Sequence, residues 1–155
     1  MQLAQLSAEE REFLCGPAAE DEALISGFAA RLAAVLSART RQQVRVQAAA
    51  GLDTPEAAGS DLRLAWDGAL DALWLCGRLG GSAGVAVSSA LRASLQRTLQ
   101  LALAEVWLSQ RPPRLPAQLS FEILSGARRA RLDVFFPASV AAMKLWAVHT
   151  IRHAE

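Results

Sequence analysis

The sequence predicts an α+β fold, a mixed α/β sandwich in which helices pack on a largely antiparallel sheet. Several long segments repeat apolar residues at helical spacing, and four short segments alternate apolar with polar residues. These segments follow the order helix, helix, strand, strand, helix, helix, strand, strand, helix. A doubly wound nucleotide-binding sheet needs strict alternation of strands and helices, so that class is disfavoured.

Composition limits the class of protein and its partners. The 155 residues are 52% hydrophobic and 20% charged, which is typical of one globular domain. With Lys+Arg 16 against Asp+Glu 15, the net charge of +1 gives no general attraction to nucleic acid or to an anionic membrane. Cys15 and Cys76 indicate reduced, inert thiols rather than a disulfide framework. The start lacks a signal-peptide pattern and no uncharged apolar run could span a bilayer, so we expect a cytoplasmic location.

The N-terminal part divides into an arm and the start of the main domain. Residues 1–20 form an arm with a short helix, in which Ser7 and Glu10 make a capping box. Gly16 and Pro17 break that helix and divide the arm from the rest of the chain. Residues 21–155 form a single α/β domain. Its first helix is predicted over about 22–39, because apolar residues recur there at helical spacing: Leu24, Phe28, Leu32, Val35 and Leu36.

The middle of the chain predicts two strands, a helix and a glycine-rich loop. QQVRVQA and DLRLAW alternate apolar and polar residues, and the loop AAGLDTPEAAGS separates them. WDGALDALWLCGRL is a helix that Asp67 can cap and that the Gly-Gly pair closes. A long helix then begins at Ser88 or Ser89 and runs to about Gln110. Its apolar stripe is wide enough to predict packing on more than one side.

The C-terminal third predicts a hairpin and a final helix. AQLSFEIL and ARLDVFF alternate as strands around the turn SGARR, which places Arg128 and Arg129 at a solvated hairpin tip. Pro137 is expected to open the helix ASVAAMKLWAVHTIRH. Trp66, Trp74, Trp107 and Trp146 each stand within an apolar pattern, which indicates core or interface anchors rather than base-stacking platforms.

The loop GGSAG, residues 80–84, is the first candidate for chemistry. It matches neither phosphate-binding glycine motif, since no Lys follows it and a helix rather than a strand precedes it. Gly80, Ser82 and Gly84 fit G-x-S-x-G loosely, but the loop does not lie at a strand-to-helix elbow, which disfavours nucleophilic catalysis. Two interpretations remain open: a flexible corner, or a surface that another protein's backbone can approach closely.

His149 and His153 are the second candidate. They stand one helical turn apart, the spacing at which two imidazoles can share a metal ion. No third ligand accompanies them, so an exposed last turn whose basic side chains suit the helix C-terminus is the favoured interpretation. We therefore expect no metal and no cofactor.

The order of these segments resembles the middle domain of the flagellar switch protein FliM and the N-terminal region of the SctQ-type C-ring proteins of type III secretion injectisomes. The similarity covers residues 22 to about 150. It rests on ISGFAARLAAVLSARTRQQVRV, LRLAWDGALDALWLCGRLGG with its Gly-Gly end, ALRASLQRTLQLALAEVW with its aromatic end, the strand pair, and FFPASVAAM.

The FliM/SctQ resemblance implies a CheC-like fold and a non-catalytic cytoplasmic scaffold of a type III secretion or flagellar C-ring. Such a scaffold lies at the inner membrane only as part of its complex. Its expected partners are other C-ring or secretion-platform proteins, with a separate C-terminal β-rich module as a further candidate. The glycine loop of the flagellar protein contacts the next ring component. The resemblance therefore implies a partner-binding role, without the Pro of that family's motif, for these residues: Gly80, Gly81, Ser82, Gly84 and the rim charge Arg78.

Two alternatives to a scaffold remain. CheC-type phosphatases share the fold and use an acidic residue or Ser, then Glu and Asn. The long helix here has Ser94, Thr98 and Leu101 instead, so a phosphatase would need a divergent site. A secretion chaperone or adaptor that dimerises through its long helix is the other alternative, although such chaperones are usually acidic.

Overall fold

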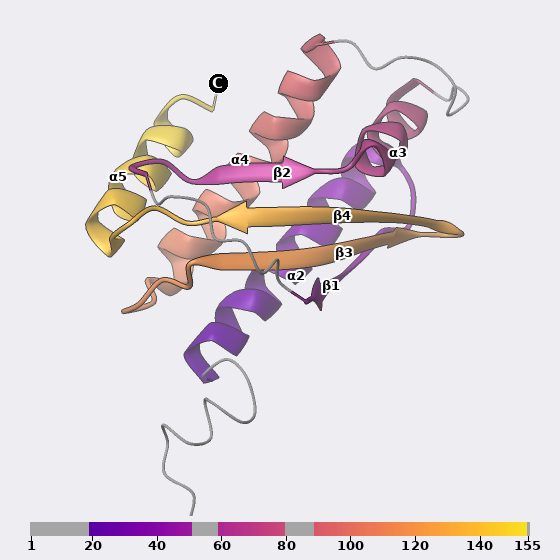
Figure 1. Ribbon diagram of the computed structural model, residues 1–155. Coiled ribbons are helices and arrows are strands. Elements are labelled where there is room, and N and C mark those ends of the chain that lie inside the picture. Colours follow the sequence, from indigo (N-terminus) through magenta and orange to yellow (C-terminus); the bar gives the residue numbers. More distant parts are fainter. Residues whose placement is uncertain (1–18, 51–58, 80–88, 155) are drawn as a thin grey trace, which may run out of the picture.

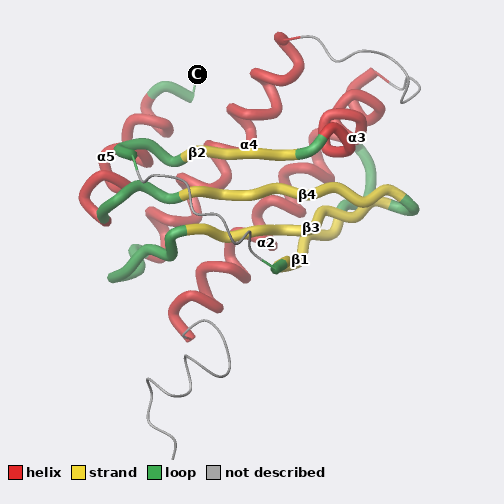
Figure 2. The backbone as a smooth tube through the Cα atoms, viewed as in Figure 1, coloured by secondary structure: helices red, strands yellow, loops and turns green. Residues whose placement is uncertain are grey.

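A computed structural model describes residues 19–50, 59–79 and 89–154. Figure 1 shows a sheet with its helices gathered on one face, and Figure 2 shows the same two layers by secondary structure. This arrangement confirms the predicted α+β sandwich. In chain order the described elements are α2 (Ala19–Thr40), β1 (Arg45–Ala49), β2 (Arg63–Trp66), α3 (Gly68–Leu79), α4 (Ser89–Gln110), β3 (Gln118–Ser125), β4 (Arg128–Phe135) and α5 (Val140–Arg152).

The sheet has four strands in the order β1-β3-β4-β2, and each neighbouring pair is antiparallel. The central pair is the predicted hairpin, which turns at Gly126 with φ 59, a left-handed conformation that glycine adopts without strain. The two outer strands come from the first half of the chain, which places β1 beside β3 and β2 beside β4. The predicted strands are all present, and their alternation gives one face to the helices.

The core lies between that face and the helix layer. Phe28 of α2 contacts Phe121 of β3 edge to face, with ring centroids 6.5 Å apart, and stacks on Phe136 at 6.0 Å. Each of these aromatic rings is buried. Aromatic pairs of this kind add roughly 0.5–1.5 kcal/mol to the free energy gained by burying their area. The apolar stripe of α2 is therefore fixed on the hairpin, as its helical spacing predicts.

The long helix α4 is the central helix of its layer. It packs against α2, α5 and α3, and its buried side chains are Leu95, Leu99, Ala102, Leu103, Ala104 and Trp107. These residues occupy more than one side of the helix, which confirms the prediction drawn from its wide apolar stripe. Trp74, Trp107 and Trp146 are buried and Trp66 is half-buried, so the indoles act as core anchors.

Two helix starts test the predicted caps. Asp67 caps α3, since its Oδ1 accepts a hydrogen bond from the backbone N of Leu70 at 3.2 Å. The prediction that Pro137 opens the last helix is wrong: α5 begins at Val140, and Ser139 is its N-cap, accepting from the backbone N of Ala142 at 3.1 Å. Pro137 is buried instead. A serine side chain satisfies a free N–H of the first turn, which proline cannot do, so the cap decides the boundary.

Helix α2 is long and apolar enough, from Glu22 to Thr40, to cross a membrane by length and composition. A helix in the core of a globular domain meets the same criteria. Here the large side chains of α2 that face the sheet have no exposed surface: Leu24, Phe28, Leu32 and Leu36. These four side chains are the part of α2 that packs in the core, and 28% of the apolar window is buried.

Candidate functional site

The predicted partner-binding residues lie at the junction of α3 and α4. Gly80, Gly81, Ser82 and Gly84 lie outside the described residues, as do Ser88 and Cys15. Arg78 belongs to the last turn of α3, and its side chain is not described. The described residues on either side are Leu79, where α3 ends, and Ser89, where α4 begins.

A polar cluster of Trp66, Asp71 and Arg92 lies at the start of α4. The indole Nε1 of Trp66, the last residue of β2, donates to Asp71 Oδ1 on α3 at 2.9 Å. Arg92, in the first turn of α4, forms an ion pair with the same carboxylate oxygen at 3.3 Å. Its guanidinium also lies 5.1 Å from the centroid of the Trp66 ring, within the range of a cation–π interaction. The start of α4 is therefore tied to the first turn of α3 and to the end of β2.

His149 and His153 lie on one exposed face of α5. Their rings are tilted by 32° with centroids 4.1 Å apart, and His153 Nδ1 lies 2.9 Å from the carbonyl oxygen of His149. One ring nitrogen of His153 is thus engaged by the backbone. Among the described residues no group of three or more His, Cys, Asp or Glu could hold a metal ion. The pair is thus better described as part of a surface than as a ligand set.

A groove that the sequence did not reveal crosses the helix layer. Helices α2, α4 and α5 each contribute residues at helical spacing to its lining, most of them outside the core; Ala102 and Trp146 belong to both. The face of α2 starts at Arg31, that of α4 at Ser94 and that of α5 at Ala142, and each continues for at least two turns. Small side chains leave the groove open: Ala34 and Ala38 on α2, Ala102 on α4 and Ala142 on α5.

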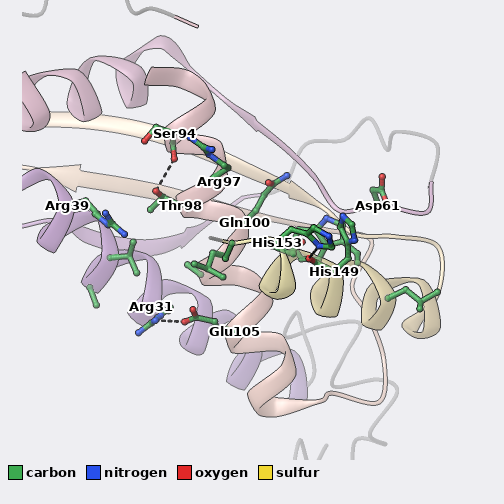
Figure 3. Close-up of a pocket in the computed structure, with 18 of the residues that line it drawn as sticks. Arg31, Arg39, Asp61, Ser94, Arg97, Thr98, Gln100, Glu105, His149 and His153 are labelled. Carbon is green, nitrogen blue, oxygen red and sulfur yellow. Dashed lines mark hydrogen bonds and ion pairs between the residues drawn. The ribbon is translucent and has the colours of Figure 1, made fainter. Parts of the chain in front are cut away.

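The groove combines apolar and charged surface. Its volume is about 1180 Å³, above the roughly 300–1000 Å³ typical of small-molecule pockets. Leu145 lines the groove, and 74% of its surface is exposed, an unusual value for a large apolar side chain. Figure 3 shows Arg39 and Arg97 on neighbouring helices and Asp61 well away from Arg39. The remaining pair, Arg31 and Glu105, neutralise each other by an ion pair.

The positions that correspond to the phosphatase residues of the resemblance lie in this groove. Ser94, Thr98 and Leu101 all line it, and the Thr98 hydroxyl donates to the backbone oxygen of Ser94 at 2.9 Å (Figure 3). A threonine hydroxyl occupied by its own helix and a leucine supply neither a carboxylate to position water nor an amide to hold phosphate. The groove is therefore poorly equipped for phosphate hydrolysis at these positions.

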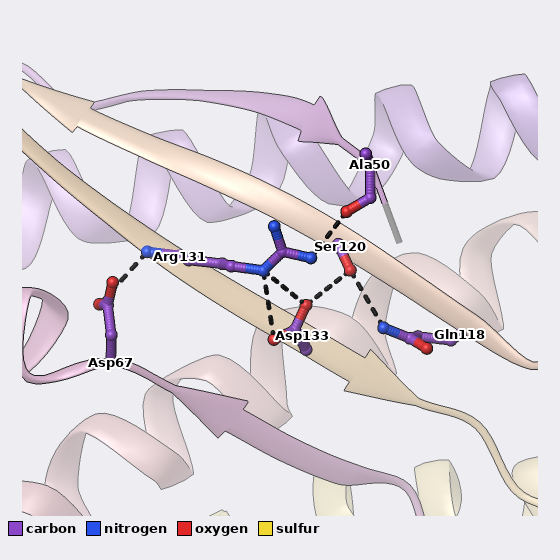
Figure 4. Close-up of polar contacts among 6 residues, drawn as sticks. All are labelled: Ala50, Asp67, Gln118, Ser120, Arg131 and Asp133. Carbon is purple, nitrogen blue, oxygen red and sulfur yellow. Dashed lines mark hydrogen bonds and ion pairs between the residues drawn. The ribbon is translucent and has the colours of Figure 1, made fainter. Parts of the chain in front are cut away.

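A second polar cluster lies on the other face of the sheet (Figure 4). Asp133, which is 7% exposed, accepts a hydrogen bond from Ser120 Oγ at 2.6 Å and from Arg131 Nε at 3.1 Å. Arg131 Nη2 donates to the backbone oxygen of Ala50, just beyond β1, at 2.6 Å. Gln118 donates to Ser120 Oγ at 3.2 Å. Because each group is directed at a neighbour within the sheet, this cluster stabilises the structure and offers no free reactive group.

The fold and its surfaces thus define an α+β domain with a clamped junction between two helices and an open groove across its helix layer. The sequence matches no protein-family model, and no curated protein is similar to it.

Proposed function

We propose that this chain is a non-catalytic scaffold of a type III secretion or flagellar C-ring, in the cytoplasm, and that it acts through contacts with other ring proteins. The observation that carries the proposal is the Trp66, Asp71 and Arg92 cluster, which ties the first turn of α4, just after the glycine-rich segment, to the first turn of α3. Binding residues are often carried by a loop that a rigid scaffold positions. A loop poor in side chains suits the close approach of a partner backbone.

The order of elements also supports a scaffold of this class. The described helices and strands follow the order of the segments on which the FliM/SctQ resemblance rests. The CheC-type alternative receives less support, because Thr98 and Leu101 stand where that chemistry needs a carboxylate and an amide.

Affinity purification of the tagged full chain from its source cells tests the proposal. We expect C-ring or secretion-platform proteins to co-purify, and Gly81→Trp to reduce their recovery while the circular dichroism spectrum is unchanged. Gly59→Trp is the matched control, because a Cβ at Gly59 meets no atom within 4 Å. Recovery that is equal for the two variants would contradict the role of the loop.

An enzymatic assay separates the scaffold from the phosphatase. The purified chain is mixed with a phosphorylated response regulator, and loss of the phosphoryl group is followed. The scaffold proposal expects the rate to equal that of the regulator alone, and an acceleration that Ser94→Ala removes would replace the scaffold with an enzyme.

A further inference from the structure

We propose that the groove formed by α2, α4 and α5 receives the N-terminal arm of a second copy of this chain. This surface is separate from the loop on which the proposed function rests. The contact would join an arm on one copy to a groove on the next, so it is heterologous and extends into rings or open chains. Its occupant is the segment that precedes α2, of sequence MQLAQLSAEEREFL.

The shape of the groove suits a helix. Its lining on α4 runs from Ser94 to Glu105, roughly 16 Å at the α-helical rise. With Ser7 as its N-cap, the predicted helix of the arm covers roughly 9 Å of that length from Ala8 to Leu14, and residues 3–7 precede it. An amphipathic helix laid in an apolar groove is a recurring mode of peptide recognition.

The charges of the arm and groove are complementary. Arg39 and Arg97 line the groove, and no described carboxylate forms an ion pair with either. Asp61 is the only lining carboxylate that Arg31 does not neutralise, and it lies well away from Arg39 in Figure 3. Residues 9–12 of the arm carry three glutamates and one arginine and are therefore negative overall: Glu9, Glu10, Arg11 and Glu12. Opposite charges of this kind favour association and fix its orientation.

The apolar residues are matched as well. Leu145, 74% exposed, lines the groove, as do half-buried Val35 and Leu101. The arm brings large apolar side chains that could cover them: Leu3, Leu6, Phe13 and Leu14. Covering exposed leucine is favourable at about 25 cal/mol per Å² of apolar surface removed from water, so this part of the contact adds affinity that salt does not screen.

Two complementary variants of the full chain test the contact. The first reverses the arm, Glu9→Lys with Glu10→Lys, and the second reverses the groove, Arg39→Glu with Arg97→Glu. In sedimentation velocity we expect the native chain to self-associate, each variant alone to associate at least about tenfold more weakly, and an equimolar mixture to recover association. In that mixture the native arm of one variant meets the native groove of the other, and the reversed arm meets the reversed groove with opposite charges again.

A charge reversal outside the groove and a competing peptide serve as controls for this contact. Arg45→Glu with Arg128→Glu makes the same charge change on exposed residues outside the groove, and we expect it to leave association unchanged. If the groove variant fails to fold, the synthetic peptide of residues 1–14 is added to the native chain and should dissociate its oligomers. A native chain that is monomeric up to about 1 mM, or a groove variant that associates like the control, overturns the proposal.

Discussion

Replacement of Asp133 by Ala tests how much the polar cluster of the sheet contributes to stability. Asp133 is 7% exposed and holds two donors, the hydroxyl of Ser120 at 2.6 Å and Nε of Arg131 at 3.1 Å. Ser120 is directly opposite Asp133 in the register of β3 and β4. Without Asp133 its hydroxyl loses the carboxylate to which it donates. Removal of the carboxylate therefore affects two elements of the sheet at once.

The magnitude follows from the exposure of each partner. A hydrogen bond to a charged group contributes roughly 1.5–3 kcal/mol, whereas breaking a fully buried ion pair costs roughly 3–5 kcal/mol. The side chain of Arg131 is 36% exposed, so water recovers part of its loss. We expect Asp133→Ala to lower the free energy of unfolding by about 2–3 kcal/mol and Ser120→Ala to lower it by about 1 kcal/mol.

Urea denaturation followed by circular dichroism measures both values, and the double variant completes a cycle. Since the two residues are in contact, we expect a coupling energy of at least about 0.5 kcal/mol. Glu122→Ala is the matched control: it lies on the same face of β3 and pairs with Arg129 at 3.1 Å, but that arginine is 75% exposed. An exposed pair contributes about 0–1 kcal/mol. A loss for Asp133→Ala no larger than that of the control, or a coupling near zero, would refute the reasoning.

Two further predictions concern the helix layer. Leu99→Ala removes a side chain with no exposed surface from the central helix, so it should cost about 2–5 kcal/mol in the same denaturation assay; an unchanged melting temperature would contradict the placement of α4. Gly27→Ala gains roughly 1 kcal/mol of helix propensity but brings Cβ against Val106 at 3.0 Å and onto the amide of Gln110, which now donates to the backbone at 3.1 Å. We therefore expect Gly27→Ala to be nearly neutral alone and stabilising in a Gln110→Ala background, where an equal effect in both backgrounds would refute the clash.

The sequence could predict most of the fold because its signals are local. The period of Leu24, Phe28 and Leu32 and the alternation around Phe121 each describe one element facing one core. The missed boundary at Pro137 has the same origin, since two local signals compete there, and the hydrogen bond that the Ser139 side chain accepts decides between them. Local patterns are reliable where a single face of a single element carries the information.

The polar cluster of Ser120, Arg131 and Asp133 could not be predicted from local sequence patterns. Alternation puts Ser120 and Asp133 on the face opposite the core, and from sequence alone that face is expected to be solvated. Both side chains are buried, because a partner strand brings each of them opposite the other and Arg131 reaches past them to the backbone after β1. Burial on this face depends on residues more than 80 positions apart in sequence, which no period of 2 or 3.6 encodes.

The groove could not be predicted from the sequence for a related reason. Each of its three faces has helical spacing, but Ala34, Ala38 and Ala142 look like ordinary helix-forming residues in a chain rich in alanine. Only packing of α2 and α5 on either side of α4 turns three unremarkable faces into one concavity. Core patterns report what a helix buries, whereas a binding surface is made of what several helices jointly leave uncovered. In this chain the uncovered surface is visible only in the tertiary structure, and the arm and groove variants test whether it binds a second copy.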